Sequence, residues 1–337
     1  MNILITSVGR RGYMIEYLRN ALGGDGEVHV SNSQYTYVFE YADKSVITPL
    51  CFDAEYIPFL KKYCLENNIS IIISLFDVDL PVLAKNKEIF ESEGIRVVVS
   101  DYEVIRICND KWETFKFLSN NNFYTPKTYI DIKKLLDDIK AGEISYPVVI
   151  KPRWGMGSIG VFIAENEEEL TVLYRKARKA MLNSYLKYES KEDMEHSIVM
   201  QEMLTGQEYG MDVINDLDGN FVSSVVRRKI AMRAGETDIA QIENNSILSS
   251  EAARLGRILG HVANLDCDVF LVNNTPYILE MNARFGGGYP FSHIAGVDMP
   301  LAIVKWIKGE QVDKDKILTA KSGIKAYKNI TLEIIEE

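Results

Sequence analysis

Residues 1–100 alternate short apolar segments with amphipathic ones, and this alternation restricts the possible folds more than any other feature of the chain. Runs rich in Ile and Val predict buried strands at Ile3–Ser7, Val28–Ser31, Ile69–Leu75 and Val97–Ser100. Helices are expected between these strands, at Gly9–Leu22, Ala54–Asn67 and Leu80–Ser92. Strands that alternate with helices form a parallel, doubly wound sheet, whose ligand sites lie at the carboxyl ends of the strands.

The loops at those strand ends carry charged residues. Arg10 and Arg11 lie in the turn Ser7–Gly12, and Asp77 lies in the loop after the third predicted strand. The turn lacks the full G-x-G-x-x-G pattern, and the second strand runs into Ser31–Ser33 without an acidic residue. Both departures argue against a dinucleotide-binding turn, and a tight strand-to-helix turn is the simpler interpretation.

Charge and cysteine usage restrict the class of protein. The formal net charge of −10 disfavours a nucleic-acid-binding surface, which needs clustered Lys and Arg, but it permits small anionic ligands in a local basic pocket. The 4 cysteines are scattered and form no CxxC pair, as expected of reduced thiols. No segment approaches the roughly 20 apolar residues of a membrane span, and no secretory signal is recognisable. We therefore expect a cytoplasmic protein with no membrane or nucleic-acid partner.

Beyond residue 100 the pattern becomes a mixture of helices and antiparallel strands. Helices are expected at Asp101–Asn120, Ile132–Lys140, Glu167–Ser190 and Ser250–Asn264, the last capped by Ser249 or Ser250. Single strands are expected at Tyr146–Lys151 and Ile198–Leu204. Two hairpins are expected, the first from Glu208–Asn215 and Phe221–Lys229, the second from Asp268–Val272 and Tyr277–Asn282.

A glycine-rich loop follows the strand that ends at Lys151. Gly155, Gly157 and Gly160, with Ser158 among them, would let backbone N–H groups approach a phosphate, to which Lys151 adds a positive charge. The pattern differs from a P-loop, because no Gly-Lys-Ser/Thr leads into a helix. For the loop alone, an ordinary hairpin turn is the alternative.

The second predicted hairpin gathers oxygen ligands. If its loop is the three residues Asn273–Thr275, Asp268 lies opposite Glu280, and strand alternation puts Asn282 and Arg284 on the same face. Two carboxylates and an amide oxygen are hard ligands that suit Mg²⁺. A loop of two residues would instead separate the faces of the two acids.

Further polar residues flank these motifs. Glu202 stands at the end of an apolar strand, where it or its backbone could contact an adenine edge, and Glu208 could accept hydrogen bonds from ribose hydroxyls. Arg227 and Lys229 form a basic strand end that suits a triphosphate or a carboxylate. The alternative for the strand with Glu202 is an exposed edge strand, and the alternative for the segment with Arg227 and Lys229 is a solvated basic edge. Phe285–Gly288 is predicted to be a flexible turn.

Together these motifs resemble the ATP-grasp superfamily, in particular its carbamoyl-phosphate-synthase-like and amino-acid-ligase branch. The most specific match is Asp268–Phe270 with Leu279–Phe285, in which Ala283 replaces a common proline. The resemblance implies an α/β and α+β chain, with a Rossmann-like pre-ATP-grasp domain followed by an ATP-grasp fold. The implied boundaries are 1–105 for the first domain, 106–200 for a small lid subdomain and 201–337 for a larger C-terminal catalytic subdomain.

The resemblance also implies roles for individual residues. The residues implied to bind ATP are Lys111, Lys151, Gly155, Gly157, Ser158, Gly160, Glu202, Met203, Leu204, Glu208 and Lys229. Those implied to bind Mg²⁺ are Asp268, Glu280 and Asn282. Those implied to act in catalysis are Arg284, Lys151 and Arg227.

The implied reaction joins a small-molecule carboxylate to an amine. ATP would activate the acid as an acyl phosphate, and the amine would displace phosphate, with Mg²⁺ (or Mn²⁺) as the metal and a homodimer allowed. Two alternatives stay open: a catalytically silent ATP-binding regulatory protein, and an NAD(P)-dependent oxidoreductase. The identity of the substrates is open too, as are the roles of Arg10, Arg11, Asp77 and His293 in selecting them.

Overall fold

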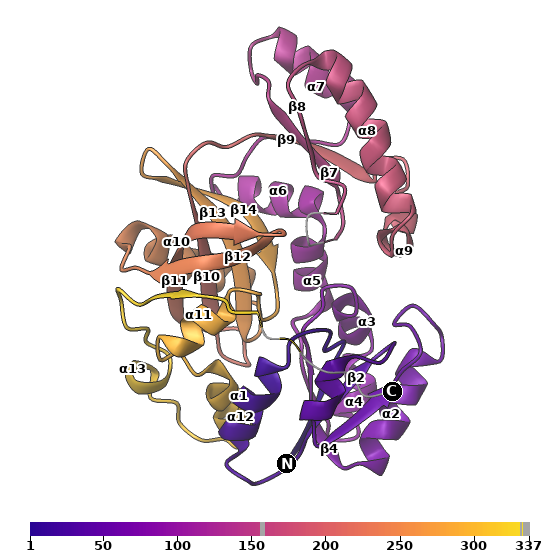
Figure 1. Cartoon of the computed structure of the whole chain (residues 1–337), viewed down its shortest axis with the longest axis vertical. Coiled ribbons are helices and arrows are strands. Elements are labelled where there is room, and N and C mark those ends of the chain that lie inside the picture. The colour runs from indigo at the N-terminus through magenta and orange to yellow at the C-terminus, as the bar shows by residue number, and fades with distance from the viewer. Residues whose placement is uncertain (156–158, 331, 333–337) are drawn as a thin grey trace.

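The computed structural model describes residues 1–155, 159–330 and 332, and it contains three β-sheets (Figure 1). The first sheet has five parallel strands in the order β3-β2-β1-β4-β5. Its strands are β1 (Asn2–Thr6), β2 (Val28–Asn32), β3 (Lys44–Ile47), β4 (Ile69–Ser74) and β5 (Arg96–Val98). The predicted parallel sheet is confirmed, but β3 was not predicted, because this exposed edge strand carries no apolar run.

Helices flank this sheet. They are α1 (Tyr13–Leu22), the 3₁₀ turn η1 (Tyr37–Tyr41), α2 (Tyr56–Glu66), α3 (Leu80–Lys85) and α4 (Lys87–Glu91). The prediction of one helix over Leu80–Ser92 is wrong, since Asn86 leaves the helical region with φ −113° and separates α3 from α4. The Asn86 side chain donates to the carbonyl of Val82 at 2.8 Å, a local bond that competes with helix continuation.

A second sheet has four strands in the order β6-β9-β7-β8 and forms the lobe at the top of Figure 1. Its elements are β6 (Thr128–Tyr129), α7 (Ile132–Lys140), β7 (Val148–Pro152), β8 (Phe162–Ala164), α8 (Glu167–Leu182), α9 (Leu186–Glu189), the 3₁₀ turn η2 (Ser190–Glu192) and β9 (Ile198–Glu202). The predicted helix Glu167–Ser190 is too long. It ends at Leu182, because Asn183 has ψ 3° and turns the chain toward the short α9.

Two helices, α5 (Tyr102–Asn109) and α6 (Lys111–Asn120), connect the first sheet to this lobe. The sequence predicted a single helix here, and the break at Asp110 corrects that prediction. Asp110 is extended, and its side chain caps α6 by accepting from the backbone N–H groups of Trp112 and Glu113 at 2.9 and 3.3 Å. The same carboxylate forms two 2.7 Å bonds with Arg153, so that the break is fixed by tertiary contacts as well as by capping.

The third sheet has six antiparallel strands in the order β14-β13-β10-β11-β12-β15. Its strands are β10 (Gln207–Asn215), β11 (Phe221–Arg233), β12 (Glu236–Ile242), β13 (Asn264–Val272), β14 (Thr275–Asn282) and β15 (Lys325–Tyr327). Both predicted hairpins are confirmed. However, β11 extends to Arg233 and turns into β12, so Arg227 and Lys229 lie within a strand and not at its end.

The remaining helices are α10 (Ser246–Leu259), α11 (Tyr289–Ile294), α12 (Met299–Ile307) and α13 (Lys314–Ile317). The predicted cap of α10 at Ser249 or Ser250 is wrong, since Asn245 accepts from the backbone of Leu248 at 3.1 Å and starts the helix earlier. Among the helices within the described ranges, none is both long and apolar enough to cross a lipid bilayer.

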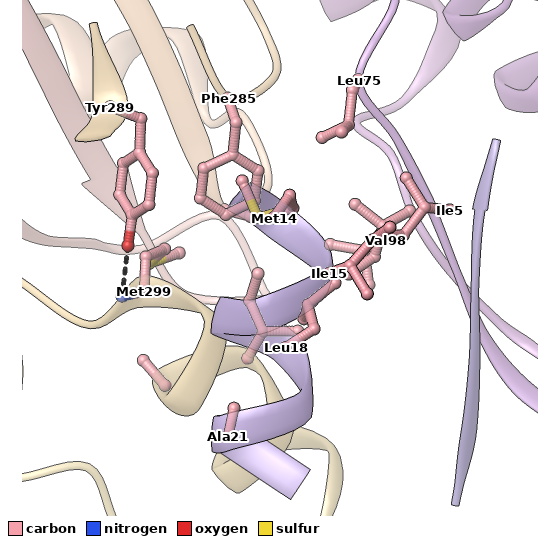
Figure 2. Close-up of a cluster of buried hydrophobic side chains, with 14 of the residues drawn as sticks. Ile5, Met14, Ile15, Leu18, Ala21, Leu75, Val98, Phe285, Tyr289 and Met299 are labelled. Atoms are coloured by element: carbon pink, nitrogen blue, oxygen red, sulfur yellow. Dashed lines mark hydrogen bonds between the residues drawn. The ribbon is translucent and has the colours of Figure 1, made fainter. Parts of the chain in front are cut away.

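Helix α1 joins the first and third sheets through one hydrophobic core (Figure 2). Met14 and Leu18 have no exposed surface and point between Ile5 of the first sheet and residues of α11 and α12. The Tyr289 hydroxyl is held in this core by the backbone N–H of Met299 at 2.9 Å. The shared core therefore fixes the first sheet, and the loops at its strand ends, against the third sheet.

We expect Leu18→Ala to lower the free energy of unfolding by about 2–5 kcal/mol, because it leaves a cavity in this core. The matched control is Leu65→Ala on α2, where the leucine is 47% exposed, and it should change stability by about 0.5 kcal/mol or less. Urea unfolding of both variants measures the difference. Equal effects of the two changes would contradict the assignment of α1 to the shared core.

Candidate functional site

A cavity of about 480 Å³ lies where the lobe, the third sheet and the first strand-end loop meet. The predicted site residues that line it are Lys111, Lys151, Gly155, Glu202, Met203, Leu204, Glu208, Arg227, Lys229, Asp268, Glu280, Asn282 and Arg284. Gly160 is not among the lining residues and instead packs near Pro152 and Ala180 with φ 68°. Gly157 and Ser158 lie outside the described residues.

The β13–β14 hairpin pairs Asp268 with Glu280, as expected, but it does so with a shorter loop and a β-bulge. Its loop is the two residues Asn273 and Asn274, both with positive φ (49° and 62°), so the structure has the shorter of the two loops that the sequence left open. The register then shifts by one residue between Asp268 and Val269, and Asp268 pairs with Glu280 after all. This β-bulge supplies the extra residue that the longer loop would have supplied.

The bulge sorts the residues of β14 between the two faces of the sheet. Ile278 and Met281 are fully buried on the apolar face, although their odd spacing would separate them in a regular strand. Glu280 and Asn282 line the cavity, and Asn282 pairs with Asp266 of β13. Asp266 also lines the cavity, but it was not among the predicted site residues. Strand alternation would have placed it on the same face as Asp268, two residues away.

Lysines neutralise the carboxylates at the centre of the cavity. The Lys111 ammonium lies 3.2 Å from Glu280 and donates to the carbonyl of Gly155 at 2.6 Å. Lys229 lies 2.6 Å from both Glu208 and Asp268. Burial raises the pKa of Asp268 to about 6 against the opposing charge of Lys229. Burial also opposes ionisation of Glu280, but Lys111 and Lys151 outweigh it and lower its pKa.

Lys151 is a buried ammonium at the end of β7. Burial is the main cause that lowers its pKa, Glu280 and Asp268 oppose the shift, the positive charge of Lys111 adds to it, and the net pKa is about 8. The ammonium is therefore costly to keep charged in the free protein. A bound anion would repay this cost, because it would favour the charged form.

Two arginines form a second charged cluster, in which Asp266 bridges both guanidinium groups. Arg284 lies 3.2 Å from one oxygen of Asp266, and Arg227 lies 3.1 Å from the other. Arg284 also donates twice to Asp77, at 3.1 and 2.8 Å, and Arg227 pairs with the fully buried Asp212. Asp77, whose role the sequence left open, thus holds Arg284 from the first sheet.

The glycine run after Arg284 packs tightly against this cluster, which corrects the prediction of a flexible turn. A Cβ atom on Gly286 would overlap the carboxylate of Asp266, and one on Gly288 would lie 2.9 Å from the Arg227 guanidinium. These glycines permit a close approach of the backbone to charged side chains. His293, on the helix that follows, stacks on Tyr17 with ring centroids 3.6 Å apart and does not line the cavity.

The opposite end of the cavity is more apolar. It is lined by Val149, Met203, Phe270 and Leu279. The Glu202 carboxylate accepts from the backbone N–H of Lys127 at 3.1 Å. Strand β9 ends at Glu202, so the backbone of the next two residues leaves the sheet beside an apolar surface that could take a flat ring.

The donor set at Asp268, Glu280 and Asn282 fits a magnesium ion, since all its donors are hard oxygens. Within the described ranges, no three His, Cys, Asp or Glu side chains gather into a complete metal site. Two carboxylates and one amide would therefore need further oxygens, such as those of a bound phosphate or of water, to complete the coordination.

Family models match most of the chain. Residues 3–98 match a model described as PylC-like, N-terminal domain, and residues 108–288 match one described as ATP-grasp domain. The chain is 24% identical over 248 residues to the arginine-specific large chain of carbamoyl phosphate synthase from Bacillus subtilis (strain 168). That match covers 70% of this chain but only 22% of the relative, so the chain spans about a fifth of that protein's length.

Solved structures share the fold. The biotin carboxylase domain dimer of Hydrogenobacter thermophilus 2-oxoglutarate carboxylase, in complex with MgADP, ADP and bicarbonate, has a TM-score of 0.72 at 18% identity, covering 93% of this chain and 70% of that one. L-amino acid ligase from Bacillus licheniformis has a TM-score of 0.68 at 19% identity, covering 91% and 75%. The predicted family and fold class are confirmed, whereas the domain boundaries at 105 and 200 stay predictions.

We expect Gly286→Ala to destabilise the chain by about 1–3 kcal/mol, because the new methyl group must displace Asp266 from its two arginines. The neighbouring Gly287→Ala is the matched control. Its Cβ would lie 3.6 Å from Glu236, an ordinary contact, and should cost about 0.5 kcal/mol or less. Urea unfolding checks both, and a neutral Gly286→Ala would show that the cluster tolerates displacement of Asp266.

Proposed function

Because the chain belongs to the ATP-grasp family, we propose that it is an ATP-dependent carboxylate–amine ligase. It would activate an acid as an acyl phosphate and transfer the acyl group to an amine, releasing ADP and phosphate. The observation that carries this proposal is the order of groups along one cavity. An apolar end leads to lysines and carboxylates and then to a cluster of arginines.

The apolar end suits the adenine ring, and Glu208 suits the ribose hydroxyls, as the family resemblance implied. Lys111 and Lys151 would then meet the phosphates. Burial disfavours the charged form of Lys151, and a bound phosphate would favour it. Phosphate binding and protonation of this lysine would therefore reinforce each other. Gly155 lines the same region, and its carbonyl accepts from the Lys111 ammonium at 2.6 Å.

Asp268, Glu280 and Asn282 would hold Mg²⁺, which supplies charge shielding between the phosphates and the attacking carboxylate. Lys111 and Lys229 already touch these acids, and we propose that they keep the acids ionised before the metal binds. Arg284 contributes a fixed positive charge for the phosphoryl group in transfer. Its orientation is set in advance by Asp77 and Asp266, which lowers the reorganisation cost of the reaction.

The lobe would exclude water from the intermediate. Its helix α9 reaches the loops of the first sheet, where Tyr188 stacks on Phe52 with ring centroids 4.7 Å apart and Tyr185 lies 5.7 Å from Phe76. We propose that these contacts hold the lobe against the loops of the first sheet and so help to shield the cavity from water. An acyl phosphate formed inside would meet the amine before it meets bulk water.

The proposal is tested by ADP release from pooled carboxylates and amines, with Glu280→Gln as the matched variant. The substitution keeps the shape of the side chain but removes a metal-binding charge. We expect wild-type turnover to require Mg²⁺ and both substrates, and Glu280→Gln to lower kcat by at least about 100-fold with an unchanged unfolding curve. Full activity of the variant would contradict the metal assignment.

The two alternatives predict other results in the same samples. A silent regulatory protein would bind Mg·ATP but release no ADP with any acid and amine. An oxidoreductase would bind NADH in preference to Mg·ATP, which isothermal titration would show directly. Either outcome would remove the ligase proposal.

The pKa of Lys151 predicts how ATP use depends on pH. A group whose pKa is about 8 is charged below that value and neutral above it, so kcat/KM for ATP should fall as the pH rises through about 8. Lys151→Arg should move this fall beyond pH 10, because a guanidinium stays protonated there. The measurement is a pH profile of both proteins, and coincident alkaline limbs would refute the role of Lys151.

A further inference from the structure

The cations around the cavity differ in whether they already have a carboxylate partner. Six basic side chains line it: Arg11, Lys111, Lys151, Arg227, Lys229 and Arg284. Four of them form ion pairs with Glu280, Glu208, Asp268, Asp212, Asp266 and Asp77. Among the described residues, Arg11 and Lys151 have no carboxylate within the 4.0 Å of an ion pair.

These two unpaired cations belong to different parts of the cavity. The charged neighbours that shift the pKa of Lys151 are Glu280, Lys111 and Asp268, all in the central group. Arg11 instead has Arg284, Asp77 and Asp266 as its charged neighbours. Asp266 precedes Asp268 by two residues along β13, which places it about 7 Å further from the apolar end. The phosphates already account for Lys151, but nothing in the proposed ATP site accounts for Arg11.

Arg11 is held in place without being neutralised. It lies in the turn between β1 and α1, where its backbone N–H donates to the carbonyl of Val8 at 3.1 Å. Its guanidinium reaches the segment that follows β14 and donates to the carbonyl of Phe285 at 2.7 Å. This one bond uses a single N–H group of the five that a guanidinium offers. The other donors stay available to a ligand.

The electrostatic setting favours an anion. Burial destabilises the positive charge of Arg11 and lowers its pKa, and the nearby charge of Arg284 adds to this effect. The carboxylates of Asp77 and Asp266 are shared with Arg284 and Arg227, so they compensate Arg11 only at a distance. A planar carboxylate could accept two parallel N–H bonds from the guanidinium, the geometry in which arginine binds acids most strongly.

We propose that Arg11 binds a carboxylate group of the substrate at the end of the cavity away from the apolar ring site. The inference rests on the proposed ligase function, and it assigns a substrate-binding residue to the N-terminal sheet. The carboxylate belongs either to the acid that is activated or to an amino acid that serves as the amine. In both cases the ligand is a small organic acid.

The test compares Arg11→Gln with Arg10→Gln, which removes the same charge from the exposed neighbouring residue. The probes are the twenty standard amino acids, succinate and glutarate, each beside its amide, which lacks the carboxylate. Thermal shifts without ATP give binding, and ADP release with Mg·ATP gives KM. We expect Arg11→Gln to weaken the best acid about 10- to 100-fold, with KM for ATP changed less than about 2-fold. Arg10→Gln should match the wild type, and Arg11→Lys should fall between.

The amide series identifies the source of the carboxylate. If the amide of an amino acid still reacts as the amine substrate, and only its KM is higher than that of the free amino acid, Arg11 binds the non-reacting carboxylate of the amine substrate. If the amide does not react at all, Arg11 binds the carboxylate that becomes activated. The inference is overturned if no acid stabilises the wild type, or if Arg11→Gln weakens acid and amide equally. If an acid binds through Arg11 but never promotes ADP release, the inference stands and the ligase proposal fails.

Discussion

The bridge from Asp77 through Arg284 to Asp266 is the interaction on which the rest of the site depends. It links the first sheet to the third across 207 residues of sequence, and Asp266 continues it to Arg227. Each buried charge in the bridge has partners, and removing one partner would cost several kcal/mol, because it would leave an uncompensated charge in the interior. The bridge therefore imposes one relative position on the two sheets at the cavity, and the hydrophobic core around α1 supports that position.

The paired and unpaired cations have different tasks in this arrangement. Arg227 and Arg284 are saturated by carboxylates and act as fixed parts of the cavity wall. Arg11 and Lys151 line the same cavity without a carboxylate partner among the described residues, and we propose that each meets an anionic group of a ligand. Under the proposed function, such a site would be preorganised for two anions at once, as bringing a carboxylate and a phosphate together requires.

Much of the fold follows from local patterns in the sequence. The parallel sheet and both hairpins were predicted because strand periodicity and turn residues are local signals. The errors occur where one polar side chain changes the backbone. Asp110 splits a predicted helix by capping its second half, and Asn86 and Asn183 do the same by leaving the helical region. Capping competes with helix continuation by small free energies that periodicity does not reveal.

The site shows the same division between local and tertiary information. The sequence alone determined which residue types stand at the strand ends, and the family resemblance selected the acids and lysines that the cavity does bring together. Only the tertiary structure decided the bulge that sets Asp268 opposite Glu280, the pairing of Asp77 with Arg284, and the entry of Arg11 into the cavity. The reason is that strand register and ion pairing between distant segments depend on how buried faces pack, whereas residue type and periodicity are written locally in the chain.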